Sequence, residues 1–348
     1  MDSLDQVRQP ARLMEPVVDR AAWRSEDVTA SQAGVFHWTK DELAEIDGAV
    51  AAYQATGRDL IEIDRFNFPL PQTSATLADI SRELKDGVGF TLVHGLDINR
   101  YDRRQQAIAY LGLGSYIGKP VSQNRKGHIL GHVKDLGHDY NDPQYRAYHS
   151  GNELDFHSDS CNVVGLLCLQ HAKKGGLSRI TSGVQIYNEM LARRPDLVEA
   201  LAHDIYRDRR GEIPEGMERT WKVPVFSFKD DYLTVNGGGK YAISAQRFPE
   251  VPKFTKAQKE GYDMFAELCI ELQHFQEFHP GDIQFLNNHV IQHSRTEFDD
   301  WDEDDKKRHL LRLWLEVPGI RRIHDGFNNR INGILVAGTE LTVPLEAE

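Results

Sequence analysis

The chain of 348 residues has the composition of an ordinary globular protein, with 40% hydrophobic and 27% charged residues. Its 41 basic and 53 acidic residues give a formal net charge of −12, which argues against binding to nucleic acid or to an anionic membrane, because both need a basic surface. The three cysteines are too few for a disulfide framework, and no apolar run approaches the roughly 20 residues that span a bilayer, so we expect a soluble, cytoplasmic protein.

Residues 1–35 are polar and show no sustained periodicity, and we interpret them as an N-terminal extension to a single domain over 36–348. The first helix follows at once. Thr39 and Glu42 form a T-x-x-E capping box, and apolar residues then recur at spacings of three and four as far as Tyr53. The pattern predicts a helix that begins at this box.

Two further helices and one strand are expected before residue 120. Helical periodicity covers roughly 75–85, where Gly87 ends it, and returns over about 100–112. Between these two helices, apolar residues alternate with other residues from Val88 to Leu92, as in a strand with one buried face.

After residue 120 the pattern changes to short apolar runs separated by Gly, Pro, Asn and Asp, which is typical of many short strands in a sandwich or barrel. The runs lie at about 161–169, 223–228, 232–235, 283–286 and 310–317. Helices interrupt them where Ser182 with Gln185, and Thr255 with Gln258, form capping boxes. The second helix carries an apolar stripe that we assign to core packing: Tyr262, Phe265, Cys269, Leu272 and Phe275. We therefore expect a mainly β domain with flanking helices.

Two glycine-rich segments resemble nucleotide-binding motifs only in composition. The G-x-G-x-x-x-G stretch at 112–118 has the wrong spacing for a dinucleotide fingerprint, and it follows a helix where that motif follows a strand. The G-G-G-K stretch at 237–240 lacks the first glycine and the hydroxyl residue of a phosphate loop. We interpret the second segment as a flexible turn between strands.

One histidine–carboxylate pair has the geometry of a metal site. If the sequence F-H-S-D at 156–159 lies in a strand, His157 and Asp159 point to the same face about 6.6 Å apart. His293 follows a strand-like run and a turn, and it could supply a third ligand from elsewhere in the fold, with His289 as a rival. Two histidines and one carboxylate form the facial triad of non-haem Fe(II) sites, which leaves adjacent coordination positions open.

An oxygen-activating iron needs a chelating co-substrate, and a 2-oxo diacid would bring a distal carboxylate that requires a buried cation. The last strong strand offers two candidates, because Arg312 lies on the face opposite to its leucines and a backward extension of the strand places Arg308 there too. Arginine suits a carboxylate because it is permanently charged and can form two parallel hydrogen bonds. Burial of both arginines beside an apolar strand is unfavourable unless an anion binds them. Alternatively, Arg308 could neutralise the acidic stretch at 299–305.

The stretch from about 150 to 318 resembles the taurine dioxygenase (TauD/TfdA-like) family of Fe(II)- and 2-oxoglutarate-dependent oxygenases. The matching elements are F-H-S-D, a hydrophobic strand, G-G-L-S, P-G-D-I-Q-F-L-N-N-H-V-I-Q-H-S-R and R-H-L-L-R-L-W-L, in this order. The chain departs from the family in the acidic insert at 299–305 and in the absence of prolines after Asp159. Its first 70 residues match nothing identifiable.

The resemblance implies a double-stranded β-helix, or jelly roll, as the core. It also implies that His157, Asp159 and His293 are the iron ligands. The family has His-x-Arg at the third ligand, so the H-S-R sequence favours His293 over His289.

The resemblance further implies residues that bind the co-substrate. Arg308 matches the arginine that holds the distal carboxylate of 2-oxoglutarate, and Ser178 matches a hydroxyl that assists there. Arg312 matches an arginine near the metal-proximal carboxylate and the substrate. Tyr148 and His149 precede the metal motif and could line the substrate entrance, although a plain loop role fits equally well.

The resemblance implies an Fe(II)- and 2-oxoglutarate-dependent dioxygenase that uses O2 to hydroxylate a C–H bond of a small organic substrate, with release of succinate and CO2. Arg312 suggests an anionic substrate, and Asp159 favours hydroxylation over halogenation, because its carboxylate occupies the position that a halide would need. Three alternatives stay open. The same apparatus could desaturate, cyclise or epoxidise a natural-product intermediate, a zinc hydrolase could use the same triad, and a jelly-roll protein could bind metal without catalysis. We expect no nucleic-acid or membrane partner, and the oligomeric state is open, a homo-oligomer included.

Overall fold

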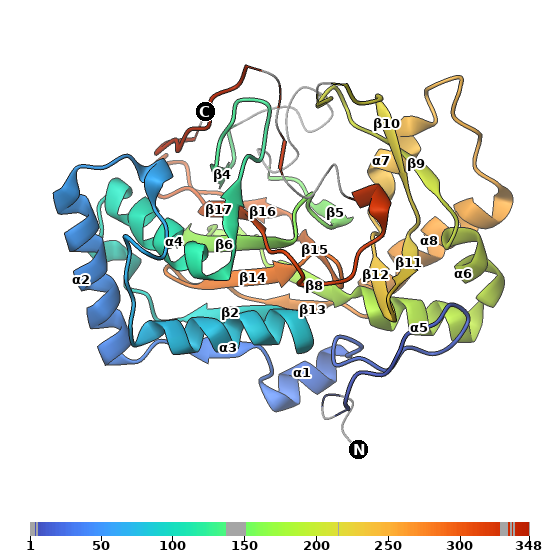
Figure 1. The fold of residues 1–348 in the computed structure, drawn as a ribbon, viewed down its shortest axis with the longest axis horizontal. Helices are drawn as coiled ribbons and strands as arrows, with labels where there is room; N and C mark the ends of the chain where they lie inside the picture. Colours follow the sequence, from blue (N-terminus) through green and yellow to red (C-terminus); the bar gives the residue numbers. More distant parts are fainter. Residues whose placement is uncertain are drawn as a thin grey trace.

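Two β-sheets form the centre of the fold (Figure 1). The computed structural model describes residues 4, 6–136, 151–214, 216–327, 333–334, 336 and 338–347. The larger sheet has the strand order β1-β2-β14-β6-β17-β3, and β4 also pairs with β17. Its strands are β1 (Val35–His37), β2 (Phe90–His94), β3 (Lys119–Val121), β4 (Leu130–Lys134), β6 (Val163–Gln170), β14 (Ile283–Asn287) and β17 (His309–Glu316). The pairing is antiparallel throughout except between β1 and β2.

The smaller sheet has the antiparallel order β13-β8-β15-β5. Its strands are β5 (Leu154–His157), β8 (Ser178–Ser182), β13 (His274–Gln276) and β15 (Ile291–Arg295). Two-stranded ladders complete the β structure of the described residues: β7 (Lys174–Gly175) with β16 (Phe298–Asp299), β9 (Ile205–Asp208) with β10 (Thr220–Val223), and β11 (Phe226–Lys229) with β12 (Tyr232–Val235).

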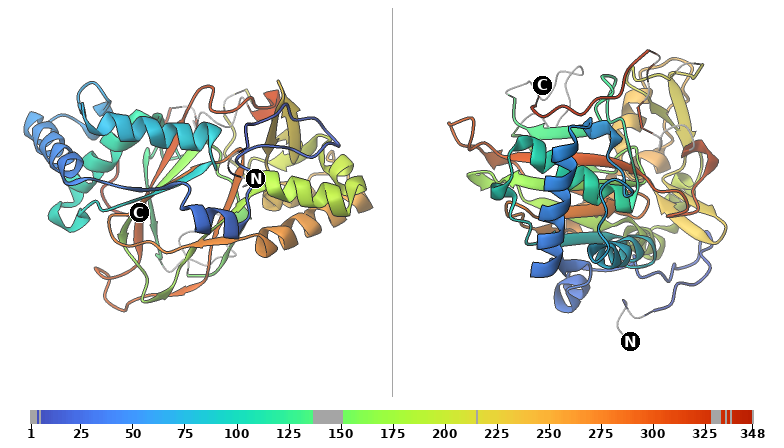
Figure 2. Two further views of the ribbon diagram at one scale, coloured as in Figure 1. Left: turned by 90° about the horizontal axis from the view of Figure 1, so that it is seen from below. Right: turned by 60° about the vertical axis from the view of Figure 1, so that its left-hand side comes forward.

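Helices cover the sheets in two groups, which lie at opposite ends of the molecule in Figures 1 and 2. The α-helices are α1 (Ser25–Ser31), α2 (Lys40–Thr56), α3 (Thr73–Asp86), α4 (Arg103–Ile117), α5 (Gly183–Arg193), α6 (Pro195–Leu201), α7 (Gly239–Ala245) and α8 (Lys256–Glu271). Short 3-10 helices lie at Leu60–Glu62, Ile98–Arg100 and Asp325–Phe327. The helices α2, α3 and α4 pack together on the larger sheet, whereas α5, α6 and α8 form the second group. No helix in the described ranges has both the length and the apolar character to cross a membrane.

The capping boxes correctly predicted the starts of three helices. Thr39 caps α2 and Thr255 caps α8, each through a reciprocal pair of hydrogen bonds with the residue three positions on. Ser182 accepts a hydrogen bond from the backbone N–H of Gln185 at the start of α5, but the Gln185 side chain donates to Glu189 and does not complete the predicted box. These local contacts satisfy N–H groups that the first turn of a helix otherwise leaves unpaired.

The N-terminal segment packs on the core more closely than an extension would. Trp23 is fully buried, and its indole N–H donates to the carbonyl oxygen of Val88 at 2.8 Å. Asp19 forms an ion pair of 2.8 Å with Arg321, and both side chains are buried. Every second residue from Val17 to Trp23 is buried, but the sequence V-V-D-R-A-A-W does not alternate between apolar and polar residues, so no hydrophobic period indicated this packing. The boundary after residue 35 stays a prediction.

Two predictions about exposure were wrong. The strand expected from Val88 to Leu92 is β2, and it is buried on both faces because Phe90 packs in one apolar cluster of the core and Val93 in the other, while β1 and β14 pair with its edges. Phe275 belongs to β13 rather than to the stripe of α8, and it is 50% exposed. The other four residues of that stripe are buried as expected.

The glycines of both rejected nucleotide motifs have packing roles. Gly112 lies in α4, where a Cβ atom would come within 2.4 Å of the Phe68 ring. A Cβ on Gly237 would come within 2.0 Å of the Phe265 ring. The segment 237–240 leads from β12 into α7, so the predicted turn between two strands was wrong, since helix follows it.

Candidate metal centre

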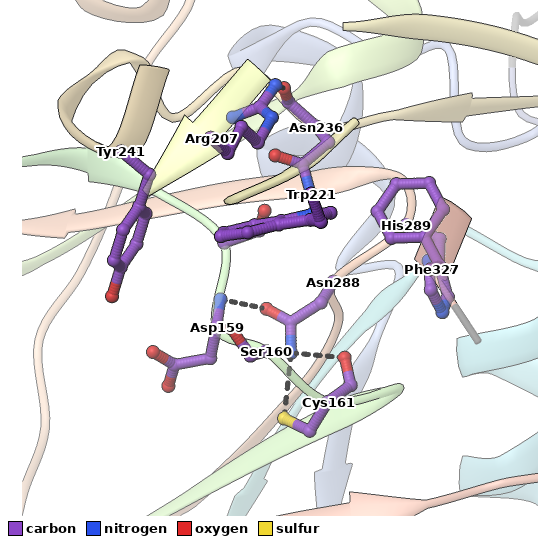
Figure 3. Close-up of a pocket in the computed structure, with 11 residues that line it drawn as sticks. Asp159, Ser160, Cys161, Arg207, Trp221, Asn236, Tyr241, Asn288, His289 and Phe327 are labelled. Atoms are coloured by element: carbon purple, nitrogen blue, oxygen red, sulfur yellow. Dashed lines mark hydrogen bonds between the residues drawn. The ribbon is translucent and has the colours of Figure 1, made fainter. Parts of the chain in front are cut away.

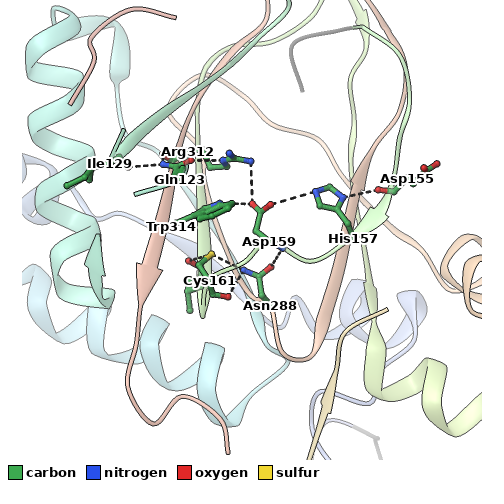
Figure 4. Close-up of polar contacts among 10 residues, drawn as sticks. Gln123, Ile129, Asp155, His157, Asp159, Cys161, Asn288, Arg312 and Trp314 are labelled. Carbon is green, nitrogen blue, oxygen red and sulfur yellow. Dashed lines mark hydrogen bonds and ion pairs between the residues drawn. The ribbon is translucent and has the colours of Figure 1, made fainter. Parts of the chain in front are cut away.

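The three predicted metal ligands come together where β5, the turn after it and β15 meet. Figure 4 shows two of them, His157 and Asp159, with the polar contacts around them. His157, Asp159 and His293 each offer a ligand atom within 4.8 Å of the others, and the described residues contain no second group of this kind. The two imidazole rings lie 4.3 Å apart between centroids, and His157 Nε2 is 3.9 Å from Asp159 Oδ1. Ligand atoms around one octahedral ion lie roughly 3 Å apart, so small side-chain adjustments would bring this group around one ion.

Strand pairing positions the two histidines. His157 is the last residue of β5, and it lies directly opposite His293 of the antiparallel neighbour β15. Side chains of directly opposed residues project from the same face of a sheet, which explains their close approach. His157 Nδ1 lies 2.8 Å from the carbonyl oxygen of Asp155, and this contact orients the ring and leaves Nε2 on the side of Asp159.

The turn after β5, rather than the strand itself, positions Asp159. The residue lies two positions beyond the end of β5, so the expectation that both motif residues share a strand face was wrong. Its backbone N–H donates to Oδ1 of Asn288 at 3.0 Å, and Asn288 Nδ2 donates to the carbonyl oxygen of Cys161. Asn288 therefore fixes the turn that carries the carboxylate back towards His157.

The carboxylate of Asp159 is buried and held in its ionised form. Its Oδ2 accepts a hydrogen bond from Trp314 Nε1 at 2.9 Å and lies 3.4 Å from Arg312 Nη1. Burial by itself would raise the pKa of Asp159, but Arg312, the two histidines and Trp314 together lower that pKa to about 2. With Oδ2 occupied in this way, Oδ1 faces His157 and is the oxygen available to a cation.

His293 has the properties of a neutral nitrogen ligand. Its side chain is buried, and burial, assisted by the charge of His157, lowers the pKa of His293 to about 3. Nδ1 of His293 is buried without a hydrogen-bond partner in the part of the chain that the structure describes. A buried polar atom without a partner is rare in proteins, and it fits a ring that turns one nitrogen towards a metal ion.

The rival histidine lies outside this group. His289 is buried, and its Nε2 is 2.9 Å from Asn162 Nδ2, while its ring meets the edge of Phe327. Burial lowers the pKa of His289 to about 3. Its position and its existing partner favour His293 as the third ligand, as the H-S-R pattern predicted.

Arg308 is a buried cation without an acidic partner among the described residues. It lies immediately before β17 and is 6% exposed, and burial lowers the pKa of its guanidinium to about 10. The guanidinium lies 5.4 Å from the centre of the Phe298 ring. A Cβ atom on Gly176 would come within 3.0 Å of Arg308 Nε, so this glycine leaves room beside the guanidinium.

The acidic insert forms no hydrogen bond or ion pair with the Arg308 side chain in the described part of the chain, although the nearby charge of Asp300 raises the pKa of Arg308 and opposes the larger effect of burial. Asp300 Oδ1 accepts a hydrogen bond from the backbone N–H of Arg308 at 2.8 Å, not from its guanidinium. Residues 302–306 are exposed, and Asp304 forms an ion pair of 2.8 Å with Lys134. The insert therefore forms the expected surface loop, and this arrangement disfavours neutralisation of the loop as the role of Arg308.

Ser178 and Arg312 have clear partners in the structure. Ser178 begins β8, and its Oγ accepts a hydrogen bond of 3.2 Å from Gln284 Nε2. Arg312 Nε donates to Gln123 Oε1 at 2.7 Å, so Arg312 is held between Gln123 and Asp159. Arg312 thus orients the carboxylate of Asp159 in addition to any contact with a bound anion.

A pocket extends from Asp159 to a wall formed by β9, β10 and the start of α7 (Figure 3). Tyr148 and His149, proposed for the substrate entrance, lie outside the described residues. The side chains that line the pocket are Ser158, Asp159, Ser160, Cys161, Arg207, Trp221, Asn236, Tyr241, Asn288, His289 and Phe327.

The sequence analysis did not identify three residues of the site. Trp314 lies two positions after Arg312 in β17, and its hydrogen bond to Asp159 had no signal in the sequence. Gln123 and Arg207 carry no local signal, because their neighbours in space are distant in sequence.

The profile of the taurine catabolism dioxygenase TauD, TfdA family matches residues 52–314. The taurine hydroxylase-like protein SAT17 of Stachybotrys chartarum is 30% identical over 325 residues, which cover 88% of this chain and 83% of that protein. The FR-33289 synthase of Streptomyces rubellomurinus is 26% identical over 322 residues, which cover 89% of this chain and 93% of the synthase.

Solved structures with the same fold include an asparagine oxygenase in complex with Fe(II), a hydroxyasparagine and succinate. Its TM-score against this chain is 0.64 and its sequence identity is 17%. The aligned region covers 83% of this chain and 98% of the asparagine oxygenase chain. The non-heme iron oxygenase OrfP in complex with Fe and alpha-ketoglutaric acid has a TM-score of 0.61 and 15% identity, and covers 81% of this chain and 94% of its own. These likenesses confirm the predicted jelly-roll fold. The profile match confirms the resemblance seen in the sequence, and the chain belongs to the taurine catabolism dioxygenase TauD/TfdA family.

Proposed function

We propose that the protein is an Fe(II)- and 2-oxoglutarate-dependent dioxygenase that hydroxylates a C–H bond of a small organic substrate and releases succinate and CO2. The observation that carries the proposal is the group of His157, Asp159 and His293, in a chain of a dioxygenase family. When bound there, iron with 2-oxoglutarate would supply the activation of O2, whereas the protein supplies geometry, charge and the exclusion of water.

The three proposed ligands have protonation states that suit a divalent cation. Asp159 is ionised and contributes one negative charge, and the lowered pKa of His293 keeps that imidazole neutral at neutral pH. Trp314 and Arg312 hold Oδ2 of Asp159 and thereby direct Oδ1 to the proposed metal position. This arrangement fixes the carboxylate before any cation binds, and it lowers the entropy that binding must overcome.

Arg308 is the proposed partner of the distal carboxylate of 2-oxoglutarate. A buried guanidinium without an anion is unfavourable, and a carboxylate that arrives with the co-substrate would supply the missing charge. Ser178 is proposed to donate its hydroxyl hydrogen to the same carboxylate, and Arg312 to contact the metal-proximal carboxylate or the substrate. A zinc hydrolase would have no use for Arg308, so this residue favours the oxygenase.

The names of related proteins support a small-molecule substrate with an anionic group. Taurine, in the name of one relative, carries a sulfonate. A uridine-5'-phosphate dioxygenase of a Streptomyces species is 24% identical over 182 residues, which cover 48% of this chain and 62% of that enzyme. OrfP structures hold hydroxyarginine, so amino acids also occur as ligands on this fold. The residues of the substrate pocket determine which of these substrate classes, sulfonates, phosphates or amino acids, the protein accepts.

Turnover of the co-substrate tests the proposal. The purified chain should convert 2-oxoglutarate to succinate and CO2 only when both Fe(II) and O2 are present, slowly without substrate and faster when a screen of small acids supplies one. His157→Ala should abolish this reaction. The matched variant His171→Ala should keep it, because His171 lies outside the ligand group and its Nδ1 contacts the carbonyl oxygen of its neighbour Ala172. Succinate formation that persists in His157→Ala, or that never depends on Fe(II), would reject the proposal.

A further inference from the structure

The pocket beside Asp159 has one wall that does not belong to the jelly roll. This wall comes from the excursion between α6 and α8, and it contributes Arg207 from β9, Trp221 from β10 and Tyr241 from α7 (Figure 3). The Trp221 and Tyr241 rings lie 6.0 Å apart between centroids. A ligand in this pocket would therefore meet Asp159 at one end and two aromatic rings and an arginine at the other.

Arg207 is 1% exposed, and within the described residues its side chain donates hydrogen bonds to backbone carbonyl oxygens, while Tyr262 interacts with it electrostatically. Its Nη1 donates to the carbonyl oxygen of Gly238 at 2.8 Å, and its Nη2 donates to that of Asn236 at 2.7 Å. Nε has no hydrogen-bond partner in the described ranges, and no carboxylate there forms an ion pair with the guanidinium. Burial accordingly lowers the pKa of Arg207.

Three other buried arginines of this chain have a carboxylate partner. Arg179 pairs with Glu153, Arg312 with Asp159 and Arg321 with Asp19. Arg308, like Arg207, has no such ion pair among the described residues. A guanidinium that only tied down a turn would gain little from its full positive charge, because a neutral donor could serve two carbonyl oxygens as well. The charge of Arg207 therefore calls for an anion that the described part of the protein does not itself provide.

We infer that Arg207 binds an anionic oxygen group of the substrate and so determines its specificity. The inference rests on the proposed function, and it defines the substrate as a molecule with a carboxylate, sulfonate or phosphonate-type group at the Arg207 end. The carbon body of the substrate would pack on Trp221 and Tyr241 and extend towards Asp159, where the C–H bond would meet the proposed iron. Arg207 is thus assigned a role separate from that of Arg308, which is proposed to hold the co-substrate.

Ligand titration tests this inference on the intact chain, loaded with Fe(II) and saturating 2-oxoglutarate in the absence of O2. The probes are butyrate, propane-1-sulfonate, propylphosphonate and the neutral 1-butanol, and binding is followed through indole fluorescence, to which Trp221 contributes. Saturating 2-oxoglutarate keeps the probes away from Arg308. At least one anion should bind about tenfold more tightly than 1-butanol, because a charge-assisted hydrogen bond is stronger than a neutral one. The anion that binds best identifies the head group.

Two substitutions at one position separate charge from structure. Arg207→Lys and Arg207→Gln both keep a donor for the backbone carbonyl oxygens, but only lysine keeps the positive charge. We expect Arg207→Gln to weaken anion binding about tenfold or more and Arg207→Lys to weaken it much less. The control Arg209→Met removes a buried guanidinium that lies 5.4 Å from the centre of the Trp221 ring but does not line the pocket, and it should leave anion binding unchanged.

The outcomes also separate this inference from the proposed function. Equal anion affinity in wild type and Arg207→Gln, equal losses in the lysine and glutamine variants, or no preference of any anion over 1-butanol would each overturn the inference. The visible absorption band expected on addition of 2-oxoglutarate is recorded before any probe is added. If that band does not appear, the proposed function is rejected. If anion binding still depends on the charge at position 207 in that case, the inferred anion site is supported independently.

Discussion

Replacement of Arg308 by methionine should selectively weaken the binding of 2-oxoglutarate. Methionine keeps most of the length and apolar contact of the side chain beside Phe298 and removes the charge. Arg308 as a whole residue is 6% exposed, so a carboxylate that binds its guanidinium forms charge-assisted hydrogen bonds largely shielded from water. Such bonds contribute about 1.5–3 kcal/mol, which corresponds to a loss of roughly 10- to 150-fold in affinity.

The assay is the dependence of the visible absorption band on 2-oxoglutarate concentration, at saturating Fe(II) and without O2. Lys306→Met is the matched control, because it removes a cation two positions away that forms an exposed ion pair with Glu303. The free energy of unfolding of Arg308→Met without ligands should equal or exceed that of wild type, since no described acidic residue pairs with the guanidinium. Unchanged 2-oxoglutarate affinity together with a less stable protein would show that Arg308 supports the fold instead.

Three further predictions follow from the site and its surroundings. His293→Ala should abolish stoichiometric Fe(II) binding, whereas His289→Ala should keep it, and the opposite result in a metal titration would reverse the ligand assignment. Arg312→Met should reduce the ratio of product formed to succinate released more than it reduces 2-oxoglutarate affinity, because Arg312 also orients the carboxylate of Asp159. Measurement of product and succinate in the same reaction checks this, and a loss of 2-oxoglutarate affinity alone would contradict it. His309 lies 2.8 Å from His132, between Nε2 and Nδ1, and burial followed by the charge of His132 lowers its pKa to about 3, below the unfolded value of about 6.5. The stability that depends on neutral His309 is therefore present above about pH 6.5 and declines as the pH falls below it. His309→Gln should make the free energy of unfolding, measured with denaturant, fall less steeply between pH 7 and pH 4. An unchanged dependence of this free energy on pH would contradict the prediction.

The candidate ligands could be predicted because F-H-S-D and H-S-R are short motifs that are visible in the sequence. The pairing that places His157 opposite His293 is long-range, and the family resemblance rather than the local sequence pointed to it. The position of Asp159 was harder, because a hydrogen bond from its backbone to Asn288 bends the chain out of the strand. A period-two argument cannot detect such a turn.

The contacts that orient the site could not be predicted in the same way. Gln123 precedes β4 in the sequence, and its amide lies between Arg312 and the backbone carbonyl of Ile129 only once β4 pairs with β17. Arg207 lies in a separate ladder, and nothing in its local sequence indicates that it is buried beside the site. The roles of Gln123 and Arg207 depend on contacts between segments distant in sequence, and composition and periodicity do not predict such contacts.

Titration of the anaerobic protein with Fe(II), followed by 2-oxoglutarate, tests the central claim most directly. Wild type should bind one Fe(II) per chain and develop the visible band on addition of 2-oxoglutarate. Asp159→Gly should bind Fe(II) much more weakly, because it loses the anionic ligand, and Asp159→Glu should be impaired less. Asp155→Asn is the control, since it removes the charge of a carboxylate beside the same motif that pairs with the surface residue Lys240, and it keeps the strand that holds His157. Equal Fe(II) affinity in wild type and Asp159→Gly would contradict the account.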